Sequence, residues 1–142
     1  MQTVIKIMAA LAILFSTNMC MAATESPVIY TVDKPAIVVQ PKQMTFLIKL
    51  KSNPTTGYAW YLQKYDSNIV EPVKRVFEAP DNKKLIGAPG FEVWTFRVKP
   101  GGFTVPMQTV IHFVYVRPWE MGNPSSQVDF QVTTQPKEQI AN

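Results

Sequence analysis

The side chains that most often do covalent or metal chemistry are scarce in this chain of 142 residues, which has one cysteine, Cys20, and one histidine, His112. They cannot supply the three or four Cys or His ligands of a typical zinc site, and a disulfide within one chain needs two cysteines. A Ser/His/Asp triad would have to use His112. That residue lies in an apolar run, Val110 to Val116, where a structural histidine is the more common case. The composition therefore favours binding over catalysis, and we expect no metal and no other cofactor.

The charge of the chain gives little support for nucleic-acid binding. There are 14 Lys and Arg residues against 10 Asp and Glu, a formal net charge of +4, and the cationic residues are scattered along the sequence. A nucleic-acid-binding protein normally gathers Lys and Arg on one face or along one helix. We therefore expect no nucleic-acid partner.

Three short segments instead combine residue types that are common at binding surfaces. The first consists of Asn53, Pro54, Thr55, Thr56, Gly57 and Tyr58, the second of Gly87, Ala88, Pro89, Gly90 and Phe91, and the third of Arg117, Pro118, Trp119 and Glu120. Each contains a proline, which restricts the backbone. Taken singly, each has a simpler interpretation: a good turn sequence, a plain hairpin, and a tryptophan that covers the edge of the core.

The elements that must position these segments are predicted to be strands. Apolar and polar residues alternate with period two in several runs, and other runs are rich in aromatic and β-branched residues, which strands prefer. The predicted strands are residues 28–32 with 37–39, broken at Pro35, then 44–51, 58–62, 73–77, 91–98, 109–116 and 128–133. Met44, Phe46, Ile48 and Leu50 are expected on the core side of their strand. The 12 prolines leave little room for long helices.

About seven short strands predict an all-β fold, an immunoglobulin-like antiparallel β-sandwich without a disulfide, with a closed barrel as the alternative. The core must then be held by packing, and Trp60 is a natural centre for it. Consecutive antiparallel strands run in opposite directions, so alternate connections emerge at the same end. The segments 53–58, 87–91 and 117–120 all fall on alternate connections. We therefore expect one recognition surface of three loops on a rigid scaffold.

The first 23 residues have the layout of a secretory signal peptide. An unbroken apolar run, Ile7 to Phe15, follows a single lysine, and Cys20 to Ala23 offers small residues for cleavage. The run is too short to span a bilayer, which takes about 20 residues. We predict residues 1–23 as the signal of an exported protein, periplasmic or secreted. Residues 24–142 are then a single domain with no stable membrane insertion after cleavage.

Cys20 also permits a lipidated N-terminus. Lipid attachment normally requires small residues just before the cysteine, and here they are Asn18 and Met19, so this route is disfavoured. If Cys20 leaves with the signal, the mature protein has no thiol. The loss of its only thiol suits an oxidising compartment.

Together, the three segments resemble the signature loops of the chagasin-like inhibitors of papain-like cysteine proteases. NPTTGY at 53–58 is a specific motif, and a GxxG at 87–90 and RPW at 117–119 follow it in the family's order. The resemblance covers about Pro27 to Thr134, and the family has the same immunoglobulin-like sandwich. It implies a reversible, competitive inhibitor of papain-family cysteine peptidases that inserts the three loops into the active-site cleft. We expect it to act as a monomer.

The resemblance also implies a role for each loop. It puts the first loop at the centre of the cleft, with Thr55 nearest the catalytic cysteine and Thr56 beside it. It puts the second loop along the non-primed side, where glycines let backbone approach backbone. On the primed side, Trp119 would pack against an aromatic side chain of the protease.

Two further contacts with the protease follow from the resemblance. Pro89 and Phe91 would add an apolar contact near the second specificity pocket. Arg117 and Glu120 would supply polar contacts at the rim of the interface. A role for Arg117 as a brace of its own loop is an equal alternative, and Asn53 is expected to bond within its own loop.

Two other classes of protein fit the same features. A secreted immunoglobulin-like module could bind a carbohydrate or a surface receptor through these loops, because exposed Tyr and Trp serve such contacts as well. A structural subunit of an envelope assembly would have an exposed, unpaired edge strand. An inhibition assay separates the binding module from a peptidase inhibitor, because a lectin-type domain would leave papain untouched, whereas a structural subunit would be recognised by copurifying partners.

Overall fold

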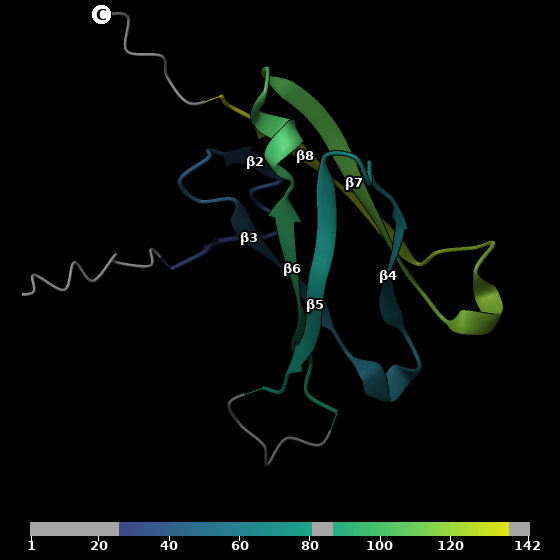
Figure 1. Ribbon diagram of the computed structural model, residues 1–142. Helices are drawn as coiled ribbons and strands as arrows, with labels where there is room; N and C mark the ends of the chain where they lie inside the picture. The colour runs from purple at the N-terminus through teal and green to yellow at the C-terminus, as the bar shows by residue number, and fades with distance from the viewer. Residues whose placement is uncertain (1–25, 81–86, 137–142) are drawn as a thin grey trace, which may run out of the picture.

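The computed structural model describes residues 26–80 and 87–136 (Figure 1). The predicted signal peptide and the lipidation question at Cys20 lie outside these residues. The described part contains eight strands and three short 3-10 turns, and none of its helices is long and apolar enough to cross a membrane. The strands are β1 (Val28–Tyr30), β2 (Ala36–Val39), β3 (Thr45–Ser52), β4 (Ala59–Lys64), β5 (Val70–Glu78), β6 (Gly90–Val98), β7 (Met107–Val116) and β8 (Ser126–Thr134). The 3-10 turns are η1 (Pro54–Thr56), η2 (Pro100–Phe103) and η3 (Pro118–Glu120).

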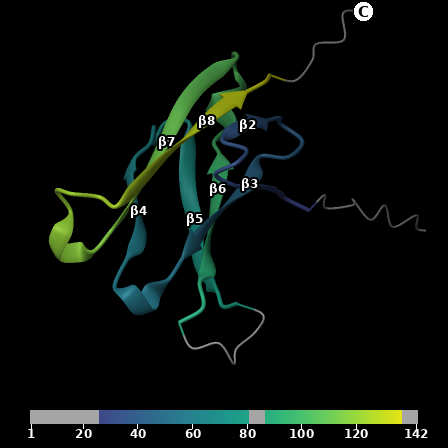
Figure 2. The ribbon, with the colours of Figure 1, turned by 180° about the vertical axis from the view of Figure 1, so that it is seen from behind.

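The strands form two packed sheets, seen from opposite sides in Figures 1 and 2. The strand order is β1-β3-β6-β5 in the first sheet and β2-β8-β7-β4 in the second. The predicted sandwich is therefore confirmed, and the alternative of a closed barrel is wrong. The central pairs β3–β6, β5–β6, β4–β7 and β7–β8 are antiparallel.

The prediction is wrong about the first strand. Its two halves are separate strands in different sheets: β1 pairs with β3 and β2 with β8, and both pairs are parallel. A turn closed by a hydrogen bond from the Lys34 amide to the Thr31 carbonyl lies between them, and Pro35 follows it. Because Pro35 has no amide hydrogen to donate to a ladder, the chain leaves one sheet there and joins the other. The strand count is eight rather than seven for this reason.

The fifth strand is also longer than its prediction. The sequence predicts residues 73–77, whereas β5 runs from Val70 to Glu78. Its register shifts between Pro72 and Lys74. The irregularity lies on an edge strand, where proline is tolerated because one side of the strand has no ladder partner.

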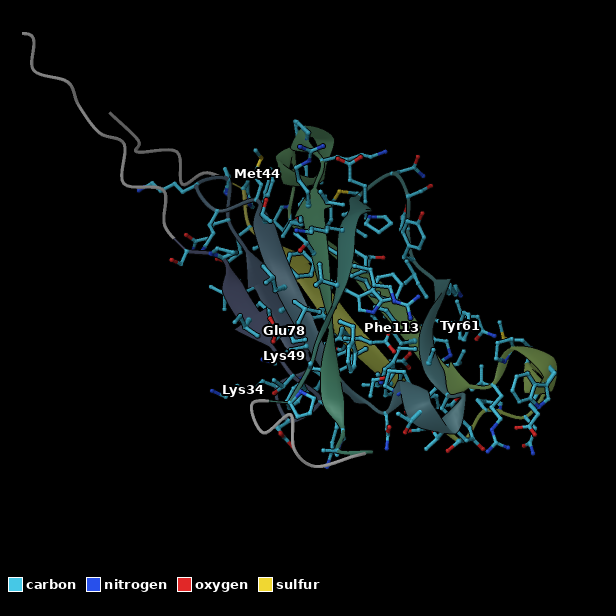
Figure 3. All side chains as sticks on the ribbon, turned by 90° about the horizontal axis from the view of Figure 1, so that it is seen from below. Lys34, Met44, Lys49, Tyr61, Glu78 and Phe113 are labelled. Carbon is cyan, nitrogen blue, oxygen red and sulfur yellow. The ribbon has the colours of Figure 1, made fainter. Side chains whose placement is uncertain are left out.

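Four fully buried phenylalanines, Phe46, Phe96, Phe113 and Phe130, run across the interior from the first sheet to the second. Their ring centroids are 5.7 to 6.1 Å apart from one ring to the next. Figure 3 shows side chains filling the space between the sheets, with Phe113 labelled. Trp60 is buried and belongs to the core, although these phenylalanines, rather than Trp60, form its centre.

The period-two pattern identifies the buried face of β3. Phe46, Ile48 and Leu50 are all buried, as predicted. Met44 does not continue the row, because it precedes the strand and is exposed. On the opposite face of the first sheet, Lys49 and Glu78 form a surface ion pair, and both are labelled in Figure 3.

Strand register brings the three predicted loops to one end of the sandwich. Ser52 pairs with Gly90 at the ends of β3 and β6, so the loops that follow and precede these residues start side by side. Ala59 pairs with Val116 in the second sheet, which places the end of the first loop beside the start of the third. Figure 1 shows the β3–β4 and β7–β8 connections and the start of β6 in the lower half of the molecule. The predicted clustering of the loops is confirmed.

Candidate functional site

The first loop, residues 53–58, crosses from the first sheet to the second and is closed by its own hydrogen bonds. Its 3-10 turn is made by the Thr56 amide donating to the Asn53 carbonyl (3.2 Å) and the Gly57 amide donating to the Pro54 carbonyl (3.0 Å). The Thr55 hydroxyl donates to Asn53 Oδ1, and the Thr56 hydroxyl to the Asn53 carbonyl, both at 2.6 Å. Pro54, Thr55 and Thr56 are nevertheless exposed. The loop is thus a preformed projection with its polar groups largely satisfied.

Gly57 is required by both the conformation and the packing of this loop. Its φ is +80°, in the left-handed region that glycine adopts at little cost. A Cβ added to Gly57 would lie 3.3 Å from the Trp119 ring. The residue that ends the 3-10 turn of the first loop therefore also makes room for the tryptophan of the third.

The second loop is joined to the first by one side chain. Asn53 Nδ2 donates to the Gly87 carbonyl at 2.9 Å. The expected bond of Asn53 within its own loop is present through Thr55, but this bridge to the second loop is not visible from the sequence. Asn53 therefore fixes two loops at once, since its amide oxygen serves the first and its amide nitrogen the second.

The remaining residues of the second segment lie in different environments. Gly87 and Pro89 are exposed and Ala88 is half-buried, whereas Gly90 is buried at the start of β6. A Cβ on Gly90 would come within 2.3 Å of the Glu78 carbonyl oxygen. Gly90 is therefore needed here because no side chain fits between β5 and β6 at this position. Phe91 lies on the outer face of the first sheet, with Lys49 Nζ 4.6 Å from its ring centroid.

A hollow of about 460 Å³ separates the first loop from the β5–β6 connection. Pro54 and Thr55 line one side, and Phe77, Pro80 and Ala88 line the other. The sequence gives no signal for Phe77 here, because residues 73–77 predict a strand without a clear alternation, and in the structure Phe77 is exposed. The end surface is therefore concave beside Thr55.

The third loop is held against the first by Arg117. Its Nε donates to the Thr56 carbonyl at 3.2 Å, and its guanidinium lies over the Tyr58 ring at 4.5 Å. It also lies 6.0 Å from the Trp119 ring and makes a 3.6 Å ion pair with Glu120. The side chain is only 35% exposed, and its contacts are with residues of the first and third loops themselves. The alternative of a brace is the one that this geometry supports.

An aromatic column continues from Arg117 into the core. Tyr58 stacks on Tyr115 with centroids 5.3 Å apart, and Tyr115 packs on Trp60 at 5.0 Å. The Tyr115 hydroxyl accepts a hydrogen bond from the Asn53 backbone amide at 2.9 Å. Trp60 Nε1 donates to the Lys51 carbonyl at 2.8 Å. Tyr115 is outside the three predicted segments, but its place on β7 two residues before Arg117, which follows the end of that strand, is a signal that could have found it.

The most exposed large hydrophobic side chain of the described residues is Trp119, in η3 with Pro118 and Glu120. It is 71% exposed, so it does not cover the edge of the core. A large apolar ring presented to solvent on a braced turn is typical of an interaction hot spot.

His112 lies away from this surface. It is on β7, opposite Asp129 of β8, and its Nδ1 is hydrogen-bonded to the Asp129 carboxylate. The side chain is 22% exposed. It is thus a partnered histidine within a sheet, which agrees with the structural interpretation of the sequence.

Comparison with known proteins gives the family. The model described as "Chagasin family peptidase inhibitor I42" matches residues 40–134, well over half of the chain. The chain therefore belongs to the chagasin family, a family of peptidase inhibitors rather than of enzymes. The matched range contains all three loops.

Individual relatives agree with this family. Chagasin of Trypanosoma cruzi is 36% identical over 76 residues, which is 51% of this chain and 64% of chagasin. The alignment thus spans less than two thirds of that relative. Among solved structures, the cysteine protease inhibitor EhICP2 of Entamoeba histolytica has a TM-score of 0.58 at 21% identity, covering 78% of this chain and 95% of that one. Amebosin has a TM-score of 0.55 at 20% identity, covering 79% and 99%. These two structures share the fold.

Proposed function

We propose that this protein is a reversible, competitive inhibitor of papain-family cysteine peptidases and acts as a monomer. The observation that carries the proposal is the braced three-loop surface, on which the NPTTGY loop is preformed and Trp119 is 71% exposed beside it. Membership of a peptidase-inhibitor family supports it, and so does the likeness to a structure described as a cysteine protease inhibitor. The three loops enter the active-site cleft together, with Thr55 nearest the catalytic cysteine.

The conformation of the first loop explains how it occupies a peptidase cleft without being cut. Peptidases of this class attack a carbonyl in an extended chain, whereas residues 54–56 form a 3-10 turn. The carbonyls of Asn53 and Pro54 already accept backbone hydrogen bonds within this turn. Cleavage would require the turn to unfold inside the cleft, so the loop blocks the cleft without serving as a substrate.

The braces explain why binding is efficient. A flexible loop loses conformational entropy when it binds, and this loss subtracts from the affinity. Here Arg117, Tyr58 and Tyr115 hold the first and third loops in place before any partner arrives. Most of the ordering therefore occurs during folding of the inhibitor.

The proposal is tested by titrating residues 24–142 into papain with a fluorogenic peptide substrate. Inhibition that weakens as substrate concentration rises supports competition for the cleft. A serine peptidase such as trypsin is the matched control, because it lacks the thiol cleft and should remain active. Full activity of papain and of cathepsin-like enzymes at micromolar inhibitor would overturn the proposal.

Export is part of the same proposal. The signal-like residues 1–23 support a periplasmic or secreted protein that meets its peptidases outside the cytoplasm. The measurement is the mass of the protein recovered from the periplasm and from the medium of expressing cells. Loss of about two dozen N-terminal residues is expected, and a full-length cytoplasmic product would contradict it.

A further inference from the structure

A charged side chain is buried directly beneath the first loop. Glu92, on β6, is only 3% exposed, and it lies on the same side of the strand as the buried Phe96 and Val98. A carboxylate at such a position is costly unless hydrogen bonds and a counter-charge compensate it. Its contacts therefore indicate what it does.

One oxygen of Glu92 joins the two stems of the loop. Oε1 accepts a hydrogen bond from the Ser52 hydroxyl at 2.7 Å and another from the Trp60 backbone amide at 3.1 Å. Ser52 is the last residue of β3 and comes directly before the loop. Trp60 is the second residue of β4, the strand that starts directly after the loop. Both ends of residues 53–58 are thus attached to a single atom.

The backbone hydrogen bonds of the sheets do not join the two stems of the loop. β3 belongs to the first sheet and pairs with β1 and β6, whereas β4 belongs to the second and pairs with β7. The loop therefore spans the gap between two sheets, and its stems do not pair with each other. The distance between the stems depends on side-chain contacts such as those of Glu92.

The other oxygen of Glu92 forms an ion pair with a partly exposed arginine. Oε2 accepts from Arg75 Nε at 2.9 Å and from Arg75 Nη2 at 2.6 Å. The Arg75 guanidinium lies 5.0 Å from the Trp94 ring, and the side chain is 43% exposed. Arg75 thus satisfies the charge, while Oε1 stays available to the loop stems.

We propose that Glu92 is a positioning residue for inhibition: its Oε1 sets the separation of Ser52 and Trp60 and so presents residues 53–58 in their binding shape. This inference rests on the proposed function, because the shape of the loop matters only if the loop enters a cleft. Loss of the acceptor loosens the stems, and the loop then loses more entropy on binding.

The test compares E92L/R75M with E92Q/R75M. Both variants remove the ion pair, and apolar replacement of a buried pair is often neutral for stability. Only the glutamine keeps a side-chain oxygen that can accept from Ser52 and Trp60. We expect an inhibition constant about ten-fold higher for E92L/R75M than for E92Q/R75M, measured on papain well below both melting temperatures. Equal inhibition constants for the two folded variants would overturn the proposal.

The matched control is the second ion pair between the same two strands. Arg97 of β6 binds Glu71 of β5 at 2.5 Å, far from the loops, near the other end of the pairing. E71L/R97M removes this pair and should leave inhibition unchanged. A rise in the inhibition constant as large as that of E92L/R75M would mean that any loss of β5–β6 pairing weakens inhibition, and the role of Glu92 would be rejected.

Two further measurements keep the outcome decisive. If E92L/R75M does not fold, S52A removes one stem contact alone and should raise the inhibition constant about three-fold; an unchanged constant would reject the proposal. Amide exchange of residues 53–58 should be faster in E92L/R75M than in E92Q/R75M. If the wild-type protein does not inhibit papain, the proposed function is wrong. If the wild type inhibits but both variants have equal inhibition constants, only the role of Glu92 is rejected.

Discussion

The first and third loops are joined by several contacts, whereas among the described residues one hydrogen bond joins the second loop to the first. Arg117 connects residues 53–58 to the third loop through the Thr56 carbonyl and the Tyr58 ring, and Tyr115 supports the first loop through the Asn53 backbone amide. The second loop depends on the bond from Asn53 to Gly87. The first and third loops are therefore one preformed unit, and the second is a separate part placed beside it. Variants of the two junctions should differ in their effects accordingly.

The largest effect is expected at the exposed end of the preformed unit. W119A removes the ring that is 71% exposed, and the inhibition constant should rise about 30-fold, equivalent to about 2 kcal/mol for a tryptophan hot spot. The melting temperature should be nearly unchanged, because little of the ring is buried. Papain inhibition and thermal unfolding measure the two quantities.

M121A, at an exposed apolar residue of the same connection, is the control for W119A and should inhibit normally. A large fall in the melting temperature of W119A would instead place the ring in the packing.

The close approach of Gly57 to Trp119 allows a substitution within the first loop to disturb the contact between the first and third loops. G57A puts a Cβ on a residue with φ +80° and 3.3 Å from the Trp119 ring. The strain is about 1 kcal/mol, so stability should fall by that amount. The inhibition constant should rise about ten-fold, because both loops must move. G122A is the control, since a Cβ there meets nothing within 4 Å. Normal inhibition by G57A would show that the two loops do not act as a unit.

The brace itself is tested by R117K. Lysine keeps the positive charge but cannot reproduce the planar group that lies over Tyr58 and donates to the Thr56 carbonyl. We expect the inhibition constant to rise about five-fold, mainly through faster dissociation. Stopped-flow measurement of the association and dissociation rates provides the check. If R117K inhibits as well as the wild type, charge alone is sufficient and the brace is not needed.

The smallest effect is expected at the junction with the second loop. N53D keeps the oxygen that accepts from the Thr55 hydroxyl but replaces the donor to the Gly87 carbonyl with a second oxygen. The inhibition constant should rise about three-fold, because only the placement of the second loop is lost. The same papain assay measures it. An effect larger than that of R117K would reverse the comparison between the two junctions.

The sequence predicts the loops better than it predicts how they are held. Alternation in β3 identifies Phe46, Ile48 and Leu50 as buried, because an inward-facing row on a half-exposed sheet must be apolar. The order of turns then predicts which loops share an end. The bridge from Asn53 to Gly87 could not be predicted, since it depends on the relative placement of two loops across β3 and β6.

One wrong prediction and one residue that the sequence analysis did not single out have the same physical origin. The pattern of β1 and β2 predicts strands but not their partners, because alternation is the same in parallel and antiparallel pairs and in either sheet. Glu92 reads as an ordinary polar position in a strand, although it is buried. Its partners come from three other strands, and only the register of the sheets brings them together. Local sequence determines the elements, and long-range register determines the junctions.

The parallel pairing of β2 with β8 has a consequence for the order of folding. Residues 36–39 pair with residues 131–134, and Gln40 is hydrogen-bonded to Gln135, 95 positions further along the chain. During synthesis β2 is made early, but its partner is the last strand to appear. Contacts between such distant residues slow folding. The second sheet is therefore completed only after β8 has been synthesised, although β4 and β7 can pair earlier. A product that ends before β8 leaves both β2 and β7 with open edges, which is the condition under which β proteins aggregate.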